Sequence, residues 1–232
     1  MQNIIFKSIQ TFNRLLSFFF RPKSTDFIYV AIGDSSVEGL GASKPDRSYT
    51  GVIHRQLRLV LKNTRYYNLG KAYAKVRDVI ENQLDRAIDL SPDLITISVG
   101  ANDIIKKTSL KQFEKDLFHL LSTLKTSTTS DIVINTIPDI TGAPAVPKYL
   151  KLAGKVMLSR INNIIRNQAE KCDVRLVDLY LTSRIFTQSY PEVLSEDGFH
   201  PSDFGYAIWA NTIIGEIKHL LWQQKESNIY KN

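Results

Sequence analysis

Residues 27–36 read FIYVAIGDSS, in which an apolar run passes directly into a glycine and a group of polar side chains. The run from Phe27 to Ile32 lacks strict alternation, which is typical of a parallel strand buried on both faces. Gly33 permits a tight turn at its end. In open α/β sheets, ligands bind beyond the carboxyl ends of the strands, so Ser35 is predicted to lie at the functional edge. A helix-capping role is the alternative for this serine.

The rest of the sequence repeats this alternation of short apolar runs with longer helical patterns. Further strands are predicted at 65–69, 94–99, 131–137 and 174–179. Helices are predicted at 48–62, 76–90, 110–126, 150–171 and 203–222. Such alternation implies parallel strands joined by right-handed crossovers. We therefore expect an α/β three-layer sandwich, a central parallel sheet of about five strands with helices on both faces, formed as one domain by residues 26–232.

The composition excludes several classes of protein. The 232 residues are 43% hydrophobic and 10% aromatic, which excludes an intrinsically disordered chain. A lone cysteine, Cys172, excludes a disulfide scaffold and a cysteine-based metal site. His54, His119 and His219 lack the spacing of a ligand set, so no metal is expected. Of the net charge of +7, residues 1–25 carry +4, and the remaining +3 is scattered among many acids, which argues against a nucleic-acid partner.

Residues 1–25 differ in character from the rest because they carry cations and no acid. Their apolar residues recur at spacings of three and four: Ile5, Ile9, Phe12, Leu16 and Phe19. This pattern predicts a basic amphipathic helix that contacts a membrane surface through residues 1–23, docks on a partner or packs on its own domain. No apolar run reaches the roughly 18 residues of a transmembrane helix, and no signal-peptide pattern is present. The expected location is cytoplasmic, with membrane association as an extension of it.

Two further polar segments are predicted at the same edge of the sheet. Asn102 follows the third predicted strand and can present a side-chain N–H donor there. Asp197 and His200 lie three residues apart on a loop that contains glycine, so the carboxylate can hold the imidazole in one tautomer. Each signal alone is weak, since a helix cap or an incidental loop pair explains it equally well. Together with Ser35 they favour nucleophilic chemistry.

On these residues the chain resembles the SGNH, or GDSL-type, serine hydrolases over about residues 27–222. The matching blocks are Gly33-Asp34-Ser35, Gly100-x-Asn102-Asp103 and Asp197-x-x-His200-Pro201. Ser36 stands where the family name has leucine, and Asp34 is interpreted as support for the nucleophile loop. The resemblance implies a flavodoxin-like sheet and hydrolysis of carboxylic esters through an acyl-enzyme, with a triad of Ser35, His200 and Asp197 and no cofactor.

The resemblance also implies an oxyanion hole. Its donors would be the backbone N–H of Ser35, the side chain of Asn102 and a backbone N–H from a further family block, which Asn68-Leu69 and Val76-Arg77 locate in this sequence. Tyr73 occupies the place of that block's glycine, and Gly70 lies three residues earlier. Either Tyr73 donates, or the loop reorganises so that Gly70 does. The loss of one oxyanion donor typically costs about 10²- to 10³-fold in turnover.

The resemblance leaves the substrate open among esters, including lipid esters, as well as thioesters and acetylated sugars. A second hypothesis is a binding module that keeps the hydrolase fold and recognises a lipid or glycan without turnover. The tyrosine at position 73 supports this alternative, whereas the intact Ser35, Asn102, Asp197 and His200 oppose it. The segment 138–150 is predicted to form a wall of the substrate pocket, with an ordinary connection as the alternative.

Overall fold

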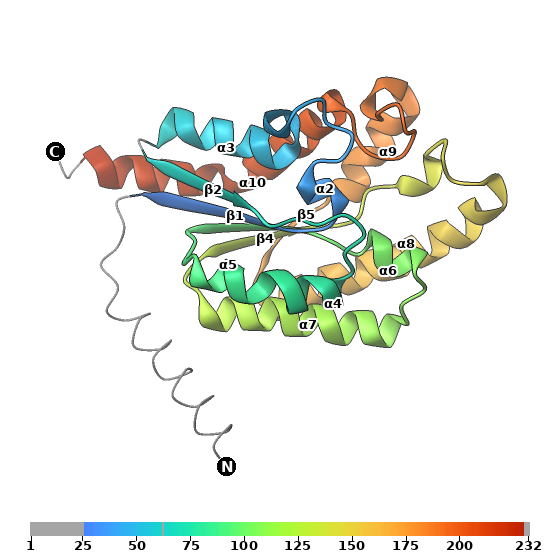
Figure 1. The fold of residues 1–232 in the computed structure, drawn as a ribbon, viewed down its shortest axis with the longest axis horizontal. Helices are drawn as coiled ribbons and strands as arrows, with labels where there is room; N and C mark the ends of the chain where they lie inside the picture. The colour runs from blue at the N-terminus through green and yellow to red at the C-terminus, as the bar shows by residue number, and fades with distance from the viewer. Residues whose placement is uncertain (1–25, 62, 230–232) are drawn as a thin grey trace, which may run out of the picture.

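A parallel five-stranded sheet forms the centre of the protein (Figure 1). The structure is a computed structural model that describes residues 26–61 and 63–229. The strands are β1 (Phe27–Gly33), β2 (Thr64–Asn68), β3 (Leu94–Ser98), β4 (Asp131–Asn135) and β5 (Arg175–Val177). Their order is β2-β1-β3-β4-β5, and every neighbouring pair is parallel. This order is the flavodoxin-like one, so the predicted fold class is confirmed.

Helices cover both faces of the sheet, as the alternating pattern predicts (Figure 1). On one face lie α3 (Tyr49–Val60), α9 (Leu179–Ser189) and α10 (Asp203–Ile229). On the other face lie α4 (Val76–Val79), α5 (Asp85–Asp89), α7 (Leu110–Ser127) and α8 (Lys148–Lys171). A π-helical turn, η2 (Ile80–Leu84), joins α4 to α5, so the helix predicted at 76–90 is continuous but locally widened.

The side chains of β1 pack alternately into two hydrophobic cores, one on each face of the sheet. Val30 and Ile32 pack into the cluster shared with α4, α7 and α8, whereas Tyr29 and Ala31 pack into the cluster shared with α3 and α10. Successive side chains of a strand point to opposite faces, so a strand covered on both sides must be apolar throughout. Residues 27–32 therefore lack an alternation of apolar and polar side chains because β1 is covered on both faces.

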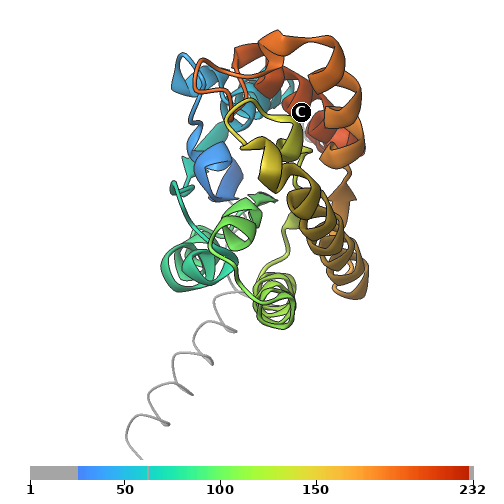
Figure 2. The same ribbon diagram turned by 90° about the vertical axis from the view of Figure 1, so that its right-hand side faces the viewer.

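Several short elements sit at the carboxyl ends of the strands (Figure 2). They are α2 (Ser35–Glu38), α6 (Ala101–Ile105) and three single 3₁₀ turns, η1 (Pro45–Arg47), η3 (Ile140–Gly142) and η4 (Pro191–Val193). α2 follows β1, α6 follows β3, and η3 follows β4, so three neighbouring strands deliver loops to one edge. Elements of three to five residues carry no periodicity, which is why the sequence did not reveal them.

The predicted amphipathic helix of residues 1–25 lies outside the described residues. Within residues 26–61 and 63–229, no helix combines the length and hydropathy needed to cross a membrane.

Candidate active site

The turn between β1 and α2 presents Ser35 at the edge of the sheet. Gly33 adopts a φ of +145°, and a Cβ at this position would collide with the carbonyl oxygen of Ser98 on β3. Asp34 caps α2 by accepting from the backbone N–H of Ser36 at 3.0 Å. The short helix therefore starts immediately after the strand, and Ser35 is its first residue.

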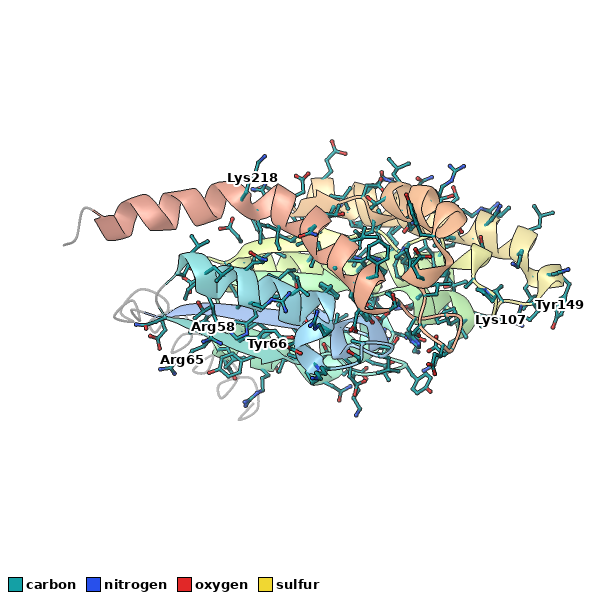
Figure 3. All side chains as sticks on the ribbon, turned by 90° about the horizontal axis from the view of Figure 1, so that it is seen from above. Arg58, Arg65, Tyr66, Lys107, Tyr149 and Lys218 are labelled. Atoms are coloured by element: carbon teal, nitrogen blue, oxygen red, sulfur yellow. The ribbon has the colours of Figure 1, made fainter. Side chains whose placement is uncertain are left out.

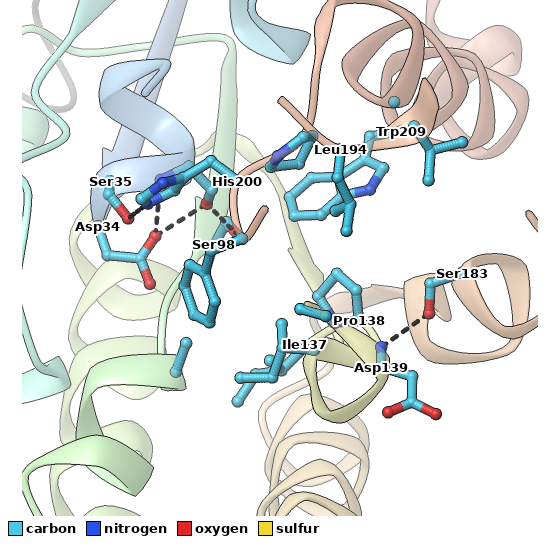
Figure 4. Close-up of a pocket in the computed structure, with 18 of the residues that line it drawn as sticks. Asp34, Ser35, Ser98, Ile137, Pro138, Asp139, Ser183, Leu194, His200 and Trp209 are labelled. Atoms are coloured by element: carbon cyan, nitrogen blue, oxygen red, sulfur yellow. Dashed lines mark hydrogen bonds between the residues drawn. The ribbon is translucent and has the colours of Figure 1, made fainter. Parts of the chain in front are cut away.

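Ser35, His200 and Asp197 lie in one hydrogen-bonded series, part of which Figure 4 shows. The Nε2 atom of His200 is 3.0 Å from the Oγ atom of Ser35. Its Nδ1 atom is 2.6 Å from the Oδ2 atom of Asp197. The structure thus brings together side chains that are 165 residues apart in the chain. A base that contacts both a hydroxyl and an orienting carboxylate is the arrangement that nucleophilic catalysis by serine requires.

Asp197 is held as a carboxylate by its own loop. Its Oδ1 atom accepts from the backbone N–H groups of Phe199 and His200 at 2.8 and 2.9 Å, and from the hydroxyl of Ser195 at 2.9 Å. Partial burial would raise the pKa of Asp197, but the hydrogen bonds from the His200 side chain and from these groups outweigh it and lower the pKa well below the usual range. The carboxylate is therefore charged at neutral pH and fixes one tautomer of the imidazole.

Asn102 and the loop 70–75 lie at the same edge. Asn102 is buried in α6, and its Nδ2 atom donates to the carbonyl oxygen of Ala74 at 3.1 Å. This bond leaves the side-chain amide next to the loop that carries Tyr73 and Gly70. The following residue, Asp103, accepts from the backbone N–H of Val76 at 3.1 Å and so ties α6 to the start of α4.

Tyr73 and Gly70 differ in what their backbone amides contact. Tyr73 has a φ of +65°, the left-handed region that a glycine would adopt freely. Its ring is 71% exposed, and within the described residues its N–H has no acceptor. The amide of Gly70 already donates to the side chain of Asn68 at 2.9 Å. A Cβ at Gly70 would lie 2.6 Å from the amide nitrogen of Glu38, so this glycine allows the loop to pack against α2.

Two side chains hold the Tyr73 loop in place. Lys106, at the end of α6, donates from Nζ to the carbonyl oxygen of Tyr73 at 2.9 Å. Glu38, at the end of α2, accepts from the amide of Ala72 at 2.6 Å. The backbone conformation at Tyr73 is thus fixed by groups on the two helices that carry Asn102 and Ser35.

A buried network below Ser35 was not anticipated from the sequence. The Oγ atom of Ser36 lies 2.8 Å from Asp34 Oδ1 and 3.0 Å from Ser98 Oγ. Asn135 on β4 donates to Ser98 Oγ at 3.1 Å. Burial raises the pKa of Asp34 to about 6, while the hydrogen bonds from Ser36 and the electrostatic interaction with His200 act to lower it and Asp103 acts to raise it. Position 36, where the family name has leucine, therefore carries a hydroxyl that stabilises the Asp34 carboxylate.

Gln83 is the second residue that the sequence did not reveal. Its side chain accepts from the N–H of Gly33 at 2.8 Å and donates to the carbonyl oxygen of Gly33 at 2.9 Å. Gln83 is buried in the π-helical turn η2. A glutamine within an apolar helical pattern is the only sequence signal for this contact, and that signal is weak because glutamine is also a common helix former.

A mainly apolar cavity of about 870 Å³, including solvent space at its mouth, opens beside Ser35 and His200. Its apolar lining includes Val99, Ile137, Ile140, Leu194, Phe199 and Trp209. In Figure 4, Ile137 and Pro138 lie on one side of the cavity, and Leu194 and Trp209 lie on the other. Of the segment predicted as a wall, 138–140 and Ala143 line the cavity, whereas Tyr149 is exposed. In the described part of the chain, no cluster of three or more acidic, histidine or cysteine side chains could hold a metal ion.

The model of the GDSL-like Lipase/Acylhydrolase family matches residues 31–208. The chain therefore belongs to this family, and it is an enzyme that acts on ester bonds. The match includes the segments that carry Ser35, Asn102 and His200. It ends within α10, beyond the last of the three blocks.

Solved structures of similar fold include several hydrolases. LAE5, an alpha/beta hydrolase enzyme from the metagenome of Lake Arreo in Spain, is 21% identical, with a TM-score of 0.68 over 86% of this chain and 97% of that one. Axe2, an acetylxylan esterase from Geobacillus stearothermophilus, is 22% identical, with a TM-score of 0.68 over 82% and 94%. TesA is 14% identical, with a TM-score of 0.69 over 83% and 99%. A comparison with curated proteins found no match.

Proposed function

We propose that the chain hydrolyses carboxylic esters through an acyl-enzyme formed on Ser35. The observation that carries this proposal is the contact series from Ser35 Oγ to His200 Nε2 and from His200 Nδ1 to Asp197, with spacings of 3.0 and 2.6 Å. Ser35 Oγ attacks the ester carbonyl while His200 takes its proton, and Asp197 stabilises the imidazolium that forms. The same proton then goes to the leaving alcohol as the C–O bond breaks.

The second half of the reaction uses the same groups in reverse roles. Water attacks the acyl carbonyl of Ser35, and His200 removes a proton from that water. Collapse of the tetrahedral intermediate releases the carboxylic acid and returns the proton to Ser35 Oγ. No step requires a metal or an organic cofactor.

The oxyanion of each tetrahedral intermediate needs fixed N–H donors. We assign these to the backbone N–H of Ser35, the side chain of Asn102 and the backbone N–H of Tyr73. Tyr73 is favoured over Gly70 because the amide of Gly70 is engaged by Asn68. For Asn102 to donate to substrate, its bond to the carbonyl oxygen of Ala74 must lengthen or be shared.

The cavity supports an acyl group longer than acetyl as part of the substrate. Apolar side chains from the loops after β3 and β4 and from α10 line it, and an alkyl chain would remove their surface from water. Axe2 and AlAXEase are named as acetyl xylan esterases, so the preferred acyl chain length distinguishes an acetyl esterase from an enzyme for longer acyl groups. We propose a lipase- or esterase-like acylhydrolase.

Hydrolysis of p-nitrophenyl esters from acetate to palmitate tests both parts of this proposal. Wild type should turn over, with its highest kcat/KM above the acetyl ester. The Ser35→Ala variant should lose at least about 10³-fold in kcat and should not react with a fluorophosphonate probe. Ser122→Ala, on α7, is the control and should behave as wild type.

A binding module on the same fold is the second candidate, and the tyrosine at position 73 is what favours it. Folded wild type that neither hydrolyses these esters nor reacts with the fluorophosphonate would support this reading. The Tyr73→Gly variant would then decide whether the tyrosine is the cause. Activity gained in that variant would show that the ring or the strained backbone blocks the site.

A further inference from the structure

The first two turns of α8 carry an exposed apolar stripe. Tyr149, Leu152 and Val156 are 82%, 76% and 50% exposed. Their spacings of three and four residues place them on one side of the helix. Large apolar side chains aligned on a helix surface in this way cost solvation free energy unless something covers them.

A row of lysines runs beside this stripe. Lys148, Lys151 and Lys155 each precede one residue of the stripe, so they share its spacing and lie on the adjacent side of the helix. No Asp or Glu occurs between Asp139 and Glu170. We call the two rows together the basic–apolar face of α8, residues 148–156.

This face adjoins the mouth of the cavity. Ala143 lines the cavity, and two residues later the amide of Ala145 donates to the carbonyl oxygen of Gly198 at 3.2 Å, in the loop that carries Asp197 and His200. Figure 3 shows Tyr149 at the end of the molecule where Lys107 lies, opposite the end that carries Arg58 and Arg65. A flat partner that covers the face would therefore lie against the rim of the candidate active site.

We propose that the basic–apolar face of α8 docks the enzyme on the surface of an anionic phospholipid bilayer. The lysines complement negative headgroups, and Tyr149, Leu152 and Val156 can enter the boundary between headgroups and acyl chains. A nucleic acid would satisfy the lysines but leave the apolar stripe exposed. The docking would bring the cavity mouth to the place where acyl lipids are present.

This inference does not depend on the proposed chemistry, because vesicle binding can be measured without turnover. It also concerns residues 148–156 and not residues 1–23, for which membrane contact is predicted from the sequence. The experiment must therefore report on the face itself in the full-length chain.

An environment-sensitive fluorophore provides that report. Leu152→Cys and, as a matched control, Leu59→Cys are labelled in a Cys172→Ser background; Leu59 is 75% exposed and lies on α3. On vesicles of phosphatidylcholine containing phosphatidylserine, the label at 152 should shift to the blue and be quenched by a lipid-borne quencher. The label at 59 should do neither. Equal responses at the two positions would overturn the proposal.

Charge removal gives a second, independent readout. Replacing Lys148, Lys151 and Lys155 by Gln should weaken binding to the anionic vesicles by roughly a hundredfold, given the usual contribution of a lysine near such a surface. The same changes at the exposed Lys111, Lys115 and Lys218 form the control set and should have much less effect. Hydrolysis of a soluble ester should stay within twofold of wild type in both sets.

A second copy of the chain is the competing partner for this face. Sedimentation of wild type and of Leu152→Ser, without lipid, distinguishes the cases. A dimer that Leu152→Ser dissociates, together with unchanged vesicle binding in the triple lysine variant, would assign the face to self-association and refute the bilayer.

Discussion

Replacing Asp34 with Asn is expected to stabilise the protein at neutral pH while it slows the reaction. Asp34 is 4% exposed, and burial raises its pKa from 3.8 to about 6. The folded state therefore binds a proton between pH 4 and 6 that the unfolded state has lost, so stability falls as pH rises through this window. The pKa difference of about two pH units corresponds to a penalty of about 3 kcal/mol at pH 7. Asparagine keeps the oxygen that accepts from Ser36 and removes the buried charge.

Urea unfolding of both proteins between pH 4 and 8 measures this effect. The two should be nearly equal in stability near pH 4, and the variant should be more stable by about 3 kcal/mol, or about 6 to 12 °C in Tm, above pH 6.5. Asp197 titrates with the opposite sign, because its lowered pKa makes stability fall as pH drops into the acid range, but both proteins keep it and it cancels in the difference. Asp46→Asn, in the exposed turn η1, controls for a lost surface charge.

The cost of the substitution should appear in kcat. The carboxylate of Asp34 interacts favourably with a positive His200, which is the state that forms during the proposed attack. Loss of that charge should lower kcat by about tenfold at pH 8, with KM nearly unchanged, since the interaction strengthens only when the imidazolium forms. A stability difference between wild type and Asp34→Asn that does not change from pH 4 to 8 would show that the Asp34 carboxyl does not titrate with a raised pKa in the folded protein.

Three further outcomes are expected. Tyr73→Gly should keep kcat within a few-fold of wild type, because the backbone amide stays, and should raise the free energy of unfolding by up to about 1 kcal/mol, because the left-handed strain is relieved. A loss of turnover above tenfold would assign a role to the tyrosine ring. Gln83→Leu should lower the free energy of unfolding in urea by about 1 to 3 kcal/mol, because the buried N–H of Gly33 loses its acceptor while its C=O keeps the bond from the Lys71 N–H. Asn82→Leu is the neighbouring control. Ala143→Phe should shift the preference to esters with shorter acyl chains because the larger side chain fills the cavity. An unchanged dependence of kcat/KM on acyl chain length would show that the acyl group binds outside this cavity.

The parallel sheet could be predicted from the sequence because strands buried on both faces are apolar without strict alternation, whereas its flavodoxin-like order was implied by the family resemblance. The stretch FIYVAI of β1 is apolar without strict alternation, and strand–helix alternation leaves few topologies. The same logic located Ser35 and Asn102, since each follows a strand whose end must lie at one edge. His200 follows no strand; its spacing from Asp197 on a glycine-containing loop indicated it weakly, and the family resemblance then supported it.

What the sequence did not show depends on contacts between distant main-chain and side-chain atoms. The side chain of Gln83 contacts Gly33, 50 residues away in the chain, and Asn135 on β4 contacts Ser98 on the neighbouring strand β3. Neither residue belongs to a local pattern, because the partner of each is fixed only when the sheet has formed. The start of α8 is a different case: the sequence predicts Leu152 and Val156 within a helix, and only the structure shows that they face outward.

Position 73 illustrates why a site built from backbone groups is difficult to read from residue identities. A sequence comparison registers a change from glycine to tyrosine as the loss of a block residue, whereas the proposed function of that residue needs only an N–H group with the correct orientation. A φ of +65° costs a tyrosine about 1 to 2 kcal/mol, and the bonds from Lys106 to the carbonyl of Tyr73 and from Ala72 to Glu38 oppose relaxation of the loop. The conformation that glycine would supply by its freedom is here imposed by neighbouring side chains. The tyrosine is therefore compatible with a complete oxyanion hole, and its exposed ring is free to contact the bound ester.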